Sequence, residues 1–147
     1  MNAHEVLADK SKSWEIFDRR VSRSYDFVSD LISLRLYRAW CKALAKALPD
    51  QASLQVLDLA SGTGIIPFTI HEARRSRGDH FTCVDLSDEM LEVFREKASG
   101  HPIEPHVELV TGDATSLEMS EGHFDVVTMA CGLRNVGDTQ ALSLIHI

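Results

Sequence analysis

The sequence predicts an α/β fold with a doubly wound parallel sheet. Two observations predict it: short apolar runs alternate with helical patterns, and the turns after those runs carry glycine and aspartate. Short, nearly all-apolar runs are typical of strands buried on both faces, and their alternation with helices indicates parallel strands joined by crossovers. In such a sheet we expect ligands at the carboxyl ends of the strands.

Size and composition are those of one ordinary globular domain. The chain has 147 residues, of which 44% are hydrophobic and 25% are charged. Its net charge of −7 disfavours nucleic acid as a partner, because phosphate binding needs clustered Lys and Arg. Three cysteines without CxxC spacing predict a reduced, cytosolic compartment. The first residues show no apolar signal core, and no long apolar run predicts a membrane span.

Hydrophobic periodicity predicts the order of elements. Apolar residues recur at steps of three and four from Leu31 to Leu48, which predicts one helical face, and Pro49 ends it. Pro67 is tolerated only in the first turn of a later helix, and Ser87 is a suitable cap for the helix after that. The expected elements are a helical region over residues 14–48, strands over 54–60, 80–85, 107–110 and 124–130, and helices beginning near residues 65 and 88.

The strongest chemical signal follows the first predicted strand. Residues 58–64 read Asp-Leu-Ala-Ser-Gly-Thr-Gly, and a strand ending in glycines lets backbone N–H groups approach a ligand closely. If Gly62 and Gly64 are aligned with the dinucleotide pattern GxGxxG, Pro67 replaces the third glycine. Asp58 would repel a pyrophosphate and attract an ammonium group. The turn therefore favours S-adenosylmethionine, which has an ammonium, a sulfonium and no phosphate; a plain tight turn is the alternative.

Acidic residues follow the next two strands as well. Asp85 ends the second predicted strand, where a carboxylate can accept both ribose hydroxyls of an adenosine. Gly112-Asp113-Ala114 follows the third, where Asp113 can accept from an adenine amino group. Gly-Asp is also a common turn, so neither motif is decisive alone. One motif at each strand end is the pattern that indicates a nucleoside-containing ligand.

Together these motifs resemble a known family. The segments 58–64, 84–87, 90–91 and 112–114 look like the successive cofactor motifs of class I methyltransferases. Gly132-Leu133-Arg134-Asn135-Val136 resembles the narrower hallmark of the ubiquinone/menaquinone biosynthesis C-methyltransferases. The N-terminal stretch resembles the same subfamily through Phe17-Asp18, Tyr25-Asp26, Asp30-Leu31, Ser33, Arg38 and Trp40. The similarity spans about residues 14 to 141.

The resemblance implies a Rossmann-like fold, with residues 1–50 as an N-terminal helical lid or substrate segment and residues 51–147 as the domain that binds S-adenosylmethionine. It implies methyl transfer from this cofactor to a ring carbon of a polyprenyl benzoquinol or naphthoquinol. It implies a cytoplasmic location, peripheral contact with the inner face of the membrane, and a homo-oligomer or a quinone-synthesis complex. The implied cofactor-binding residues are Asp58, Ser61, Gly62, Thr63, Gly64, Asp85, Leu86, Asp113, Ala114 and Ala130.

Arg134 and Asn135 are the predicted catalytic residues. Arg134 is a poor proton acceptor, so its predicted role is to stabilise a developing phenolate or position a water, with Asn135 orienting it. An ion pair that holds the loop is the alternative for Arg134. Two other functions stay open: a methyltransferase acting on another small molecule, and a non-catalytic subunit that keeps the fold. Asp58 and Pro67 disfavour a nicotinamide-dependent oxidoreductase.

The chain departs from the family pattern at a few positions. Ser61 stands where the family usually has glycine, and we expect it to be small enough to keep the turn. Ala130 stands where serine is frequent and would act through its backbone. Ile65 replaces an acid, which removes one polar contact near the methionine end of the cofactor. The seven histidines show no ligand spacing, so we predict no metal.

The resemblance also predicts that the last strands of the domain are missing. The four strands present are expected in the order 3-2-1-4, which leaves the fourth at the edge of the sheet. Val126, Val127 and Met129 belong to a strand with a pattern typical of burial on both sides, and an uncovered apolar edge promotes self-association. We expect the 147-residue chain alone to be poorly soluble and catalytically silent.

Overall fold

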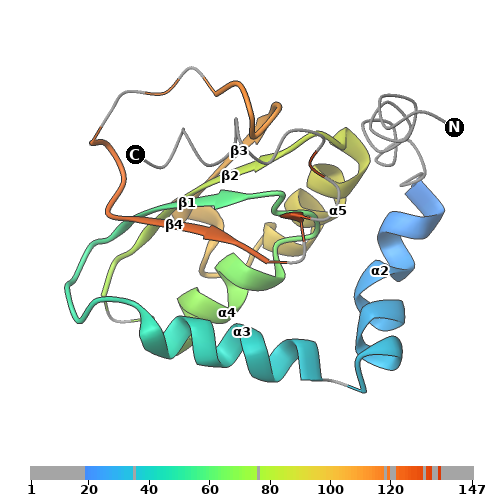
Figure 1. Cartoon of the computed structure of the whole chain (residues 1–147), viewed down its shortest axis with the longest axis horizontal. Coiled ribbons are helices and arrows are strands. Elements are labelled where there is room, and N and C mark those ends of the chain that lie inside the picture. Colours follow the sequence, from blue (N-terminus) through green and yellow to red (C-terminus); the bar gives the residue numbers. More distant parts are fainter. Residues whose placement is uncertain are drawn as a thin grey trace, which may run out of the picture.

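The computed structural model describes residues 19–34, 36–75, 77–117, 119, 122–130, 132–133 and 136. It shows an α/β fold in which strands and helices alternate from β1 to β3 (Figure 1). The helices are α2 (Arg19–Ile32), α3 (Leu36–Ala47), α4 (Ile65–Ala73), α5 (Asp88–Ala98) and the short 3₁₀ helix η2 (Glu104–His106). The strands are β1 (Gln55–Leu59), β2 (His80–Asp85), β3 (Val107–Thr111) and β4 (Val126–Met129).

The four strands form one parallel sheet in the order β3-β2-β1-β4, which confirms the predicted order. β1 lies inside the sheet, so Asp58 has Cys83 of β2 on one side and Thr128 of β4 on the other. Because all strands run in the same direction, the turns that follow them meet at one edge. This edge is where the sequence motifs lie.

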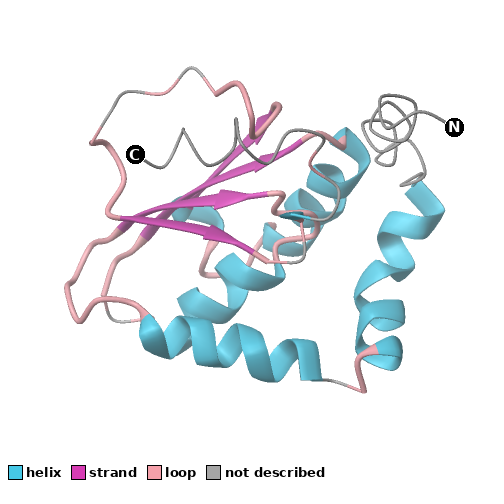
Figure 2. Ribbon diagram, in the orientation of Figure 1, coloured by secondary structure: helices cyan, strands magenta, loops and turns pink. Residues whose placement is uncertain are grey.

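The helices α3, α4 and α5 gather on one face of the sheet (Figure 2). A smaller cluster covers part of the opposite face, where Leu57, Leu59 and Val84 meet Ala114 in the segment after β3. Successive strand residues thus pack into two different clusters, which explains why the strands read as continuous apolar runs. The largest fully buried side chains of the helix-covered core are Leu54, Val56, Ile70, Phe81, Phe94 and Ile103.

The N-terminal helices differ from the predicted single helical face. Helix α2 ends at Ile32, Leu34 in the turn that follows has a φ of +49°, and α3 begins at Leu36. Leu31 and Leu34 are 63% and 82% exposed, whereas Cys41 of α3 is buried. The one-face prediction is therefore wrong, because spacing by three and four aligns side chains only along an unbroken helix. Residues 14–18 of the predicted region lie outside the described part of the chain.

The later helix boundaries agree with their sequence signals. The Ser87 side chain caps α5 by accepting from the Met90 N–H at 3.2 Å, and Asp88 and Glu89 fill the first turn. Acidic side chains at this end interact favourably with the helix dipole. Helix α4 begins after Gly64 and holds Pro67 in its first turn, as predicted.

Gly64 is a position where both conformation and space require glycine. Its φ is +84°, and a Cβ there would lie 2.6 Å from ring carbons of Phe94. Gly100 offers a matched comparison, because it also has a positive φ, +72°, but a Cβ there would meet nothing within 4 Å.

We expect Gly64→Ala to lower the free energy of unfolding by about 2–4 kcal/mol, because backbone strain adds to overpacking against Phe94. Gly100→Ala should cost only about 1–2 kcal/mol, for backbone strain alone. Urea unfolding of both variants measures the difference. Equal losses would show that the contact with Phe94 does not constrain the turn.

Candidate functional site

The carboxyl ends of β1, β2 and β3 are joined by direct contacts. The Ser61 N–H donates to the Val84 carbonyl at 3.1 Å, which links the turn after β1 to β2. The Gly112 N–H donates to the Asp85 carbonyl at 3.0 Å, which links β3 to β2. The predicted motifs after β1, β2 and β3 therefore form one continuous edge.

The turn over residues 60–64, hereafter the glycine turn, has a left-handed backbone at three positions. Ala60 and Gly62 have φ of +53° and Gly64 of +84°. The Ser61 hydroxyl donates to the Asp58 carbonyl at 2.7 Å, and the Gly64 N–H donates to the Ser61 carbonyl at 2.9 Å. Ser61 thus fits the turn where the family usually has glycine.

Asp85 is the residue on which this edge converges. Its Oδ2 accepts from the Gly62 N–H at 2.7 Å and its Oδ1 from the Ser87 N–H at 2.9 Å. Burial raises the pKa of Asp85, and these backbone donors oppose the shift. An ionised carboxylate accepts about four hydrogen bonds, so both oxygens keep capacity for further donors such as hydroxyls. The next residue, Leu86, is 40% exposed and offers an apolar surface beside it.

The turn after β3 is ordered by its own aspartate. Asp113 Oδ1 accepts from the Thr115 N–H at 2.8 Å and from the Thr115 hydroxyl at 2.7 Å. The Asp113 side chain is exposed, whereas Ala114 is buried against the sheet. Local hydrogen bonding of this kind is what makes aspartate common in turns. It fixes the backbone of the turn beside the edge and leaves the other carboxylate oxygen for another partner.

The segment after β4 approaches the glycine turn closely. A Cβ at Gly132 would lie 2.4 Å from the Cβ of Ala60, so only glycine allows this approach. Ala130, predicted to act through its backbone, is partly buried in the helix-covered core. The predicted catalytic residues Arg134 and Asn135 lie outside the described residues.

Asp58, at the carboxyl end of β1, is enclosed by protein. Its residue is only 1% exposed, and its Oδ1 accepts from the Thr128 hydroxyl of β4 at 2.6 Å. Burial raises the pKa of Asp58 to about 7, while the Thr128 and Ser61 hydroxyls act in the opposite direction and the charge of Asp85 adds to the rise. Among the described residues Asp58 has no cationic partner. A positive charge on a bound ligand would therefore stabilise the ionised form of Asp58.

Three residues of the site, Asp26, Lys97 and Thr128, were not identified as site residues from the sequence. Asp26 of α2 accepts at Oδ1 from the Thr63 hydroxyl and at Oδ2 from Lys97 of α5, the latter at 2.7 Å. Lys97 also donates to the Thr63 carbonyl at 2.7 Å. Asp26 appears in the sequence only as half of the Tyr25-Asp26 pair, and no pattern marks Lys97. Thr128 left one signal, a polar residue inside an apolar strand.

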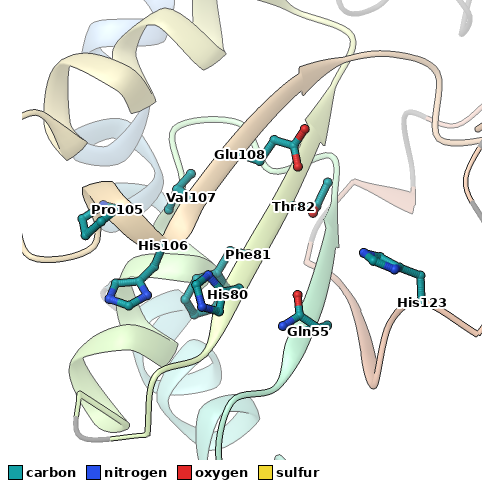
Figure 3. Close-up of a pocket in the computed structure, with 9 residues that line it drawn as sticks. All are labelled: Gln55, His80, Phe81, Thr82, Pro105, His106, Val107, Glu108 and His123. Carbon is teal, nitrogen blue, oxygen red and sulfur yellow. The ribbon is translucent and has the colours of Figure 1, made fainter.

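A hollow of about 410 Å³ opens at the other end of the sheet (Figure 3). Residues at the amino ends of the strands line it, among them Gln55, His80 and Glu108. None of the predicted site residues contributes to it. The carboxyl edge, where the sequence motifs meet, therefore remains the candidate site.

Comparison with known proteins connects this edge to a family. The model of the ubiE/COQ5 methyltransferase family matches residues 5–145. The chain belongs to the ubiE/COQ5 methyltransferase family. It is 41% identical over 124 residues to a ubiquinone/menaquinone biosynthesis C-methyltransferase UbiE of Methylobacterium nodulans, covering 83% of this chain and 48% of the relative. The corresponding protein of Rhizobium meliloti is 39% identical over 119 residues, covering 80% and 46%.

Solved structures agree with the fold of this family. A putative S-adenosyl-L-methionine-dependent methyltransferase from Methanococcus maripaludis has a TM-score of 0.72 at 14% identity, over 87% of this chain and 57% of that one. A methyltransferase from Thiobacillus denitrificans, solved with S-adenosyl-L-homocysteine, has a TM-score of 0.57 at 27% identity, over 72% and 42%. The predicted class I methyltransferase fold is confirmed. This ubiE/COQ5 chain spans about half the length of the curated relatives it matches.

The raised pKa of Asp58 predicts a pH-dependent stability. Since the folded pKa, about 7, exceeds the value near 3.9 of an unfolded aspartate, the unfolded chain releases its proton first. The contribution of Asp58 to stability is therefore full below about pH 4 and is lost as the pH rises to about 7. Asp58→Asn removes this titration while keeping an oxygen that can accept from Thr128.

Urea unfolding gives the free energy of unfolding of Asp58→Asn relative to the parent chain. We expect this difference to be about 2–3 kcal/mol more favourable to the variant at about pH 8 than at about pH 5. Glu72→Gln, an exposed carboxylate of α4, is the control and should show no such pH-dependent gain. A constant difference between Asp58→Asn and the parent at both pH values would contradict a buried, uncompensated carboxylate at Asp58.

Proposed function

We propose that this chain is the cofactor-binding part of an S-adenosylmethionine-dependent C-methyltransferase that methylates a polyprenyl benzoquinol or naphthoquinol ring in ubiquinone or menaquinone biosynthesis. One observation carries the proposal: Asp85 at the end of β2 binds both the glycine turn after β1 and Gly112 after β3. The chain in which these three turns meet belongs to the ubiE/COQ5 methyltransferase family. The substrate class is that of the UbiE relatives.

The charges of the edge suit a cationic, phosphate-free nucleoside. Asp85 keeps hydrogen-bond capacity for the ribose hydroxyls, and the exposed Asp113 lies one strand further for an adenine amino group. Asp58 would be stabilised in its ionised form by the ammonium group of the cofactor. A dinucleotide would instead bring two phosphate charges toward two carboxylates, which disfavours the oxidoreductase alternative.

The bound cofactor supplies an electrophilic methyl group on its sulfonium. The residues of this chain hold the cofactor, and the proposed role of Arg134 and Asn135 is to stabilise the phenolate that makes a quinol carbon nucleophilic. In the sequence they come two and three residues after Gly132, which itself lies close to Ala60 of the glycine turn. Alignment of the carbon with the methyl group, with water excluded, would lower the barrier by several kcal/mol.

Complementation with quinone analysis tests the proposal. The chain is joined to the C-terminal half of the Methylobacterium nodulans relative and expressed in a bacterium that lacks its own quinone methylation. We expect methylated quinone by mass spectrometry from the fusion and none from the 147-residue chain alone.

Asp85→Ala in the same fusion should weaken S-adenosylhomocysteine binding about 10- to 100-fold in calorimetry, because two hydrogen bonds to a charged group are lost. Glu72→Gln is again the exposed control. Tight binding of NADH by the parent fusion, or cofactor binding without any methylated quinone, would reject the enzyme proposal in favour of an oxidoreductase or of a non-catalytic subunit.

We further propose that the protein acts at the inner face of a membrane, where a polyprenyl quinol resides. Among the described residues no helix is long and apolar enough to cross a bilayer. The corner between α2 and α3, however, exposes large apolar side chains, and residues 31–47 contain four Lys or Arg and no acid, in a chain of net charge −7. Basic and apolar groups together suit an anionic lipid surface. The exposed side chains of this apolar corner are Leu31, Ile32, Leu34, Leu36 and Trp40.

Vesicle flotation tests the membrane contact. The fusion protein should bind phosphatidylglycerol vesicles about tenfold better than phosphatidylcholine vesicles, and Trp40→Ser should lose most of this binding because it removes a large apolar group. Leu133→Ser, at an exposed leucine outside the apolar corner, should keep it. Equal binding to both lipids, or self-association through the corner in place of vesicle binding, would contradict the proposal.

A further inference from the structure

Several large apolar side chains of helix α2 are exposed to solvent. The helix stands beside the other elements and contacts α5 and α3 (Figure 1). Phe27, Leu31 and Ile32 are 71%, 63% and 80% exposed, so most of the large apolar surface of the helix faces solvent. Helices in globular proteins are usually stabilised by a buried apolar face, so the polar contacts of α2 carry more weight than usual.

An ion pair between Asp30 and Arg38 joins α2 to α3, and a second group of polar contacts centres on Lys97. Its ammonium group donates to Asp26 of α2 and to the carbonyl of Thr63 in the glycine turn, each at 2.7 Å. It also lies 5.2 Å from the ring centre of Phe68 in α4. Thr63 closes the arrangement by donating its hydroxyl to Asp26. One side chain of α5 thus touches α2, α4 and the turn, and we call Asp26, Thr63 and Lys97 the clasp.

We propose that Lys97 is a positioning residue that couples the N-terminal helix α2 to the cofactor-binding turn, so that fastening the helix and shaping the turn for the cofactor are one event. This inference rests on the proposed function for the identity of the cofactor. Lys97 fixes the peptide carbonyl of Thr63, which lies between the left-handed residues Gly62 and Gly64. The same ammonium neutralises the carboxylate of Asp26, which would otherwise add negative charge to an edge that already holds Asp58 and Asp85.

The partial exposure of the clasp makes it reversible. The side chains of Lys97 and Asp26 are 34% and 27% exposed, so water and salt reach the ion pair. Ion pairs of this kind contribute modestly and weaken as salt is added. If a cofactor that binds the turn favours the closed clasp, then by linkage the closed clasp favours the cofactor to the same extent.

Hydrogen exchange of the fusion protein described above, with S-adenosylhomocysteine as the probe, tests the coupling. In Lys97→Met, amides of α2 should exchange at least about tenfold faster while those of β1 and β2 are unchanged, and affinity for the probe should fall about three- to tenfold. In the parent fusion the probe should slow exchange in α2, and added salt should speed it. Neither effect should occur in Lys97→Met.

Two variants serve as controls. Lys97→Arg keeps the charge and should restore most of the protection of α2. Arg95→Met removes a charge from the same helix, but its partner is Glu92 of α5 itself, so it should leave α2 unchanged. If Lys97→Met does not fold, Asp26→Asn opens the clasp from the α2 side and is expected to show the same changes.

Each result decides a separate question. Unchanged α2 exchange in the Lys97→Met and Asp26→Asn variants overturns the clasp. Faster α2 exchange with unchanged probe affinity overturns the coupling, because Lys97 would then fasten the helix only. If the parent fusion binds no S-adenosylhomocysteine, the proposed function fails, while the exchange and salt measurements still decide whether the clasp holds α2.

Discussion

The carboxylate of Asp85 holds the ligand edge of this sheet together. One oxygen accepts from the glycine turn through the Gly62 N–H, the other from the start of α5 through the Ser87 N–H, and its own carbonyl accepts from Gly112. A single residue therefore sets the relative positions of three turns that come from distant parts of the sequence. Because these partners are backbone groups, the arrangement depends little on which side chains the turns carry.

Asp58 adds an electrostatic constraint one strand away. Its carboxylate is buried beside hydroxyl groups, and the charge of Asp85 raises its pKa further. Because the carboxyl groups of Asp58 and Asp85 lie near one edge, ionising both costs free energy in the absence of a cation. A bound cation lowers that cost. Thr128 reduces the cost through a hydrogen bond that only the pairing of β4 with β1 makes available. The charges of Asp58 and Asp85 therefore favour a positively charged ligand at this edge, independently of any specific hydrogen bond to it.

The sequence was sufficient for the sheet and the turns, and insufficient for the contacts between them. The strands, the Ser87 cap and the glycine turn are local patterns with a local cause, and all are confirmed. The break at Leu34 was missed because the regular spacing of leucines continues through it. The left-handed backbone at Leu34, which interrupts the helix, leaves no mark in that spacing. The partners of Lys97 and Thr128 could not be predicted, since they lie 71 and 70 residues away and no periodicity relates them.

The exposed apolar side chains of α2 and the ion pair that holds this helix are related features of the structure. A helix that buried Phe27 and Ile32 against the core would be stable but could not present them to a lipid-like partner. Fastening by an ion pair instead leaves those side chains outside and makes the attachment weak enough to respond to the glycine turn. Under the proposed function, the same helix would then face the membrane that supplies the quinol and the turn that holds the methyl donor. Cofactor loading would stabilise the helix in the orientation in which its apolar side chains meet the lipid.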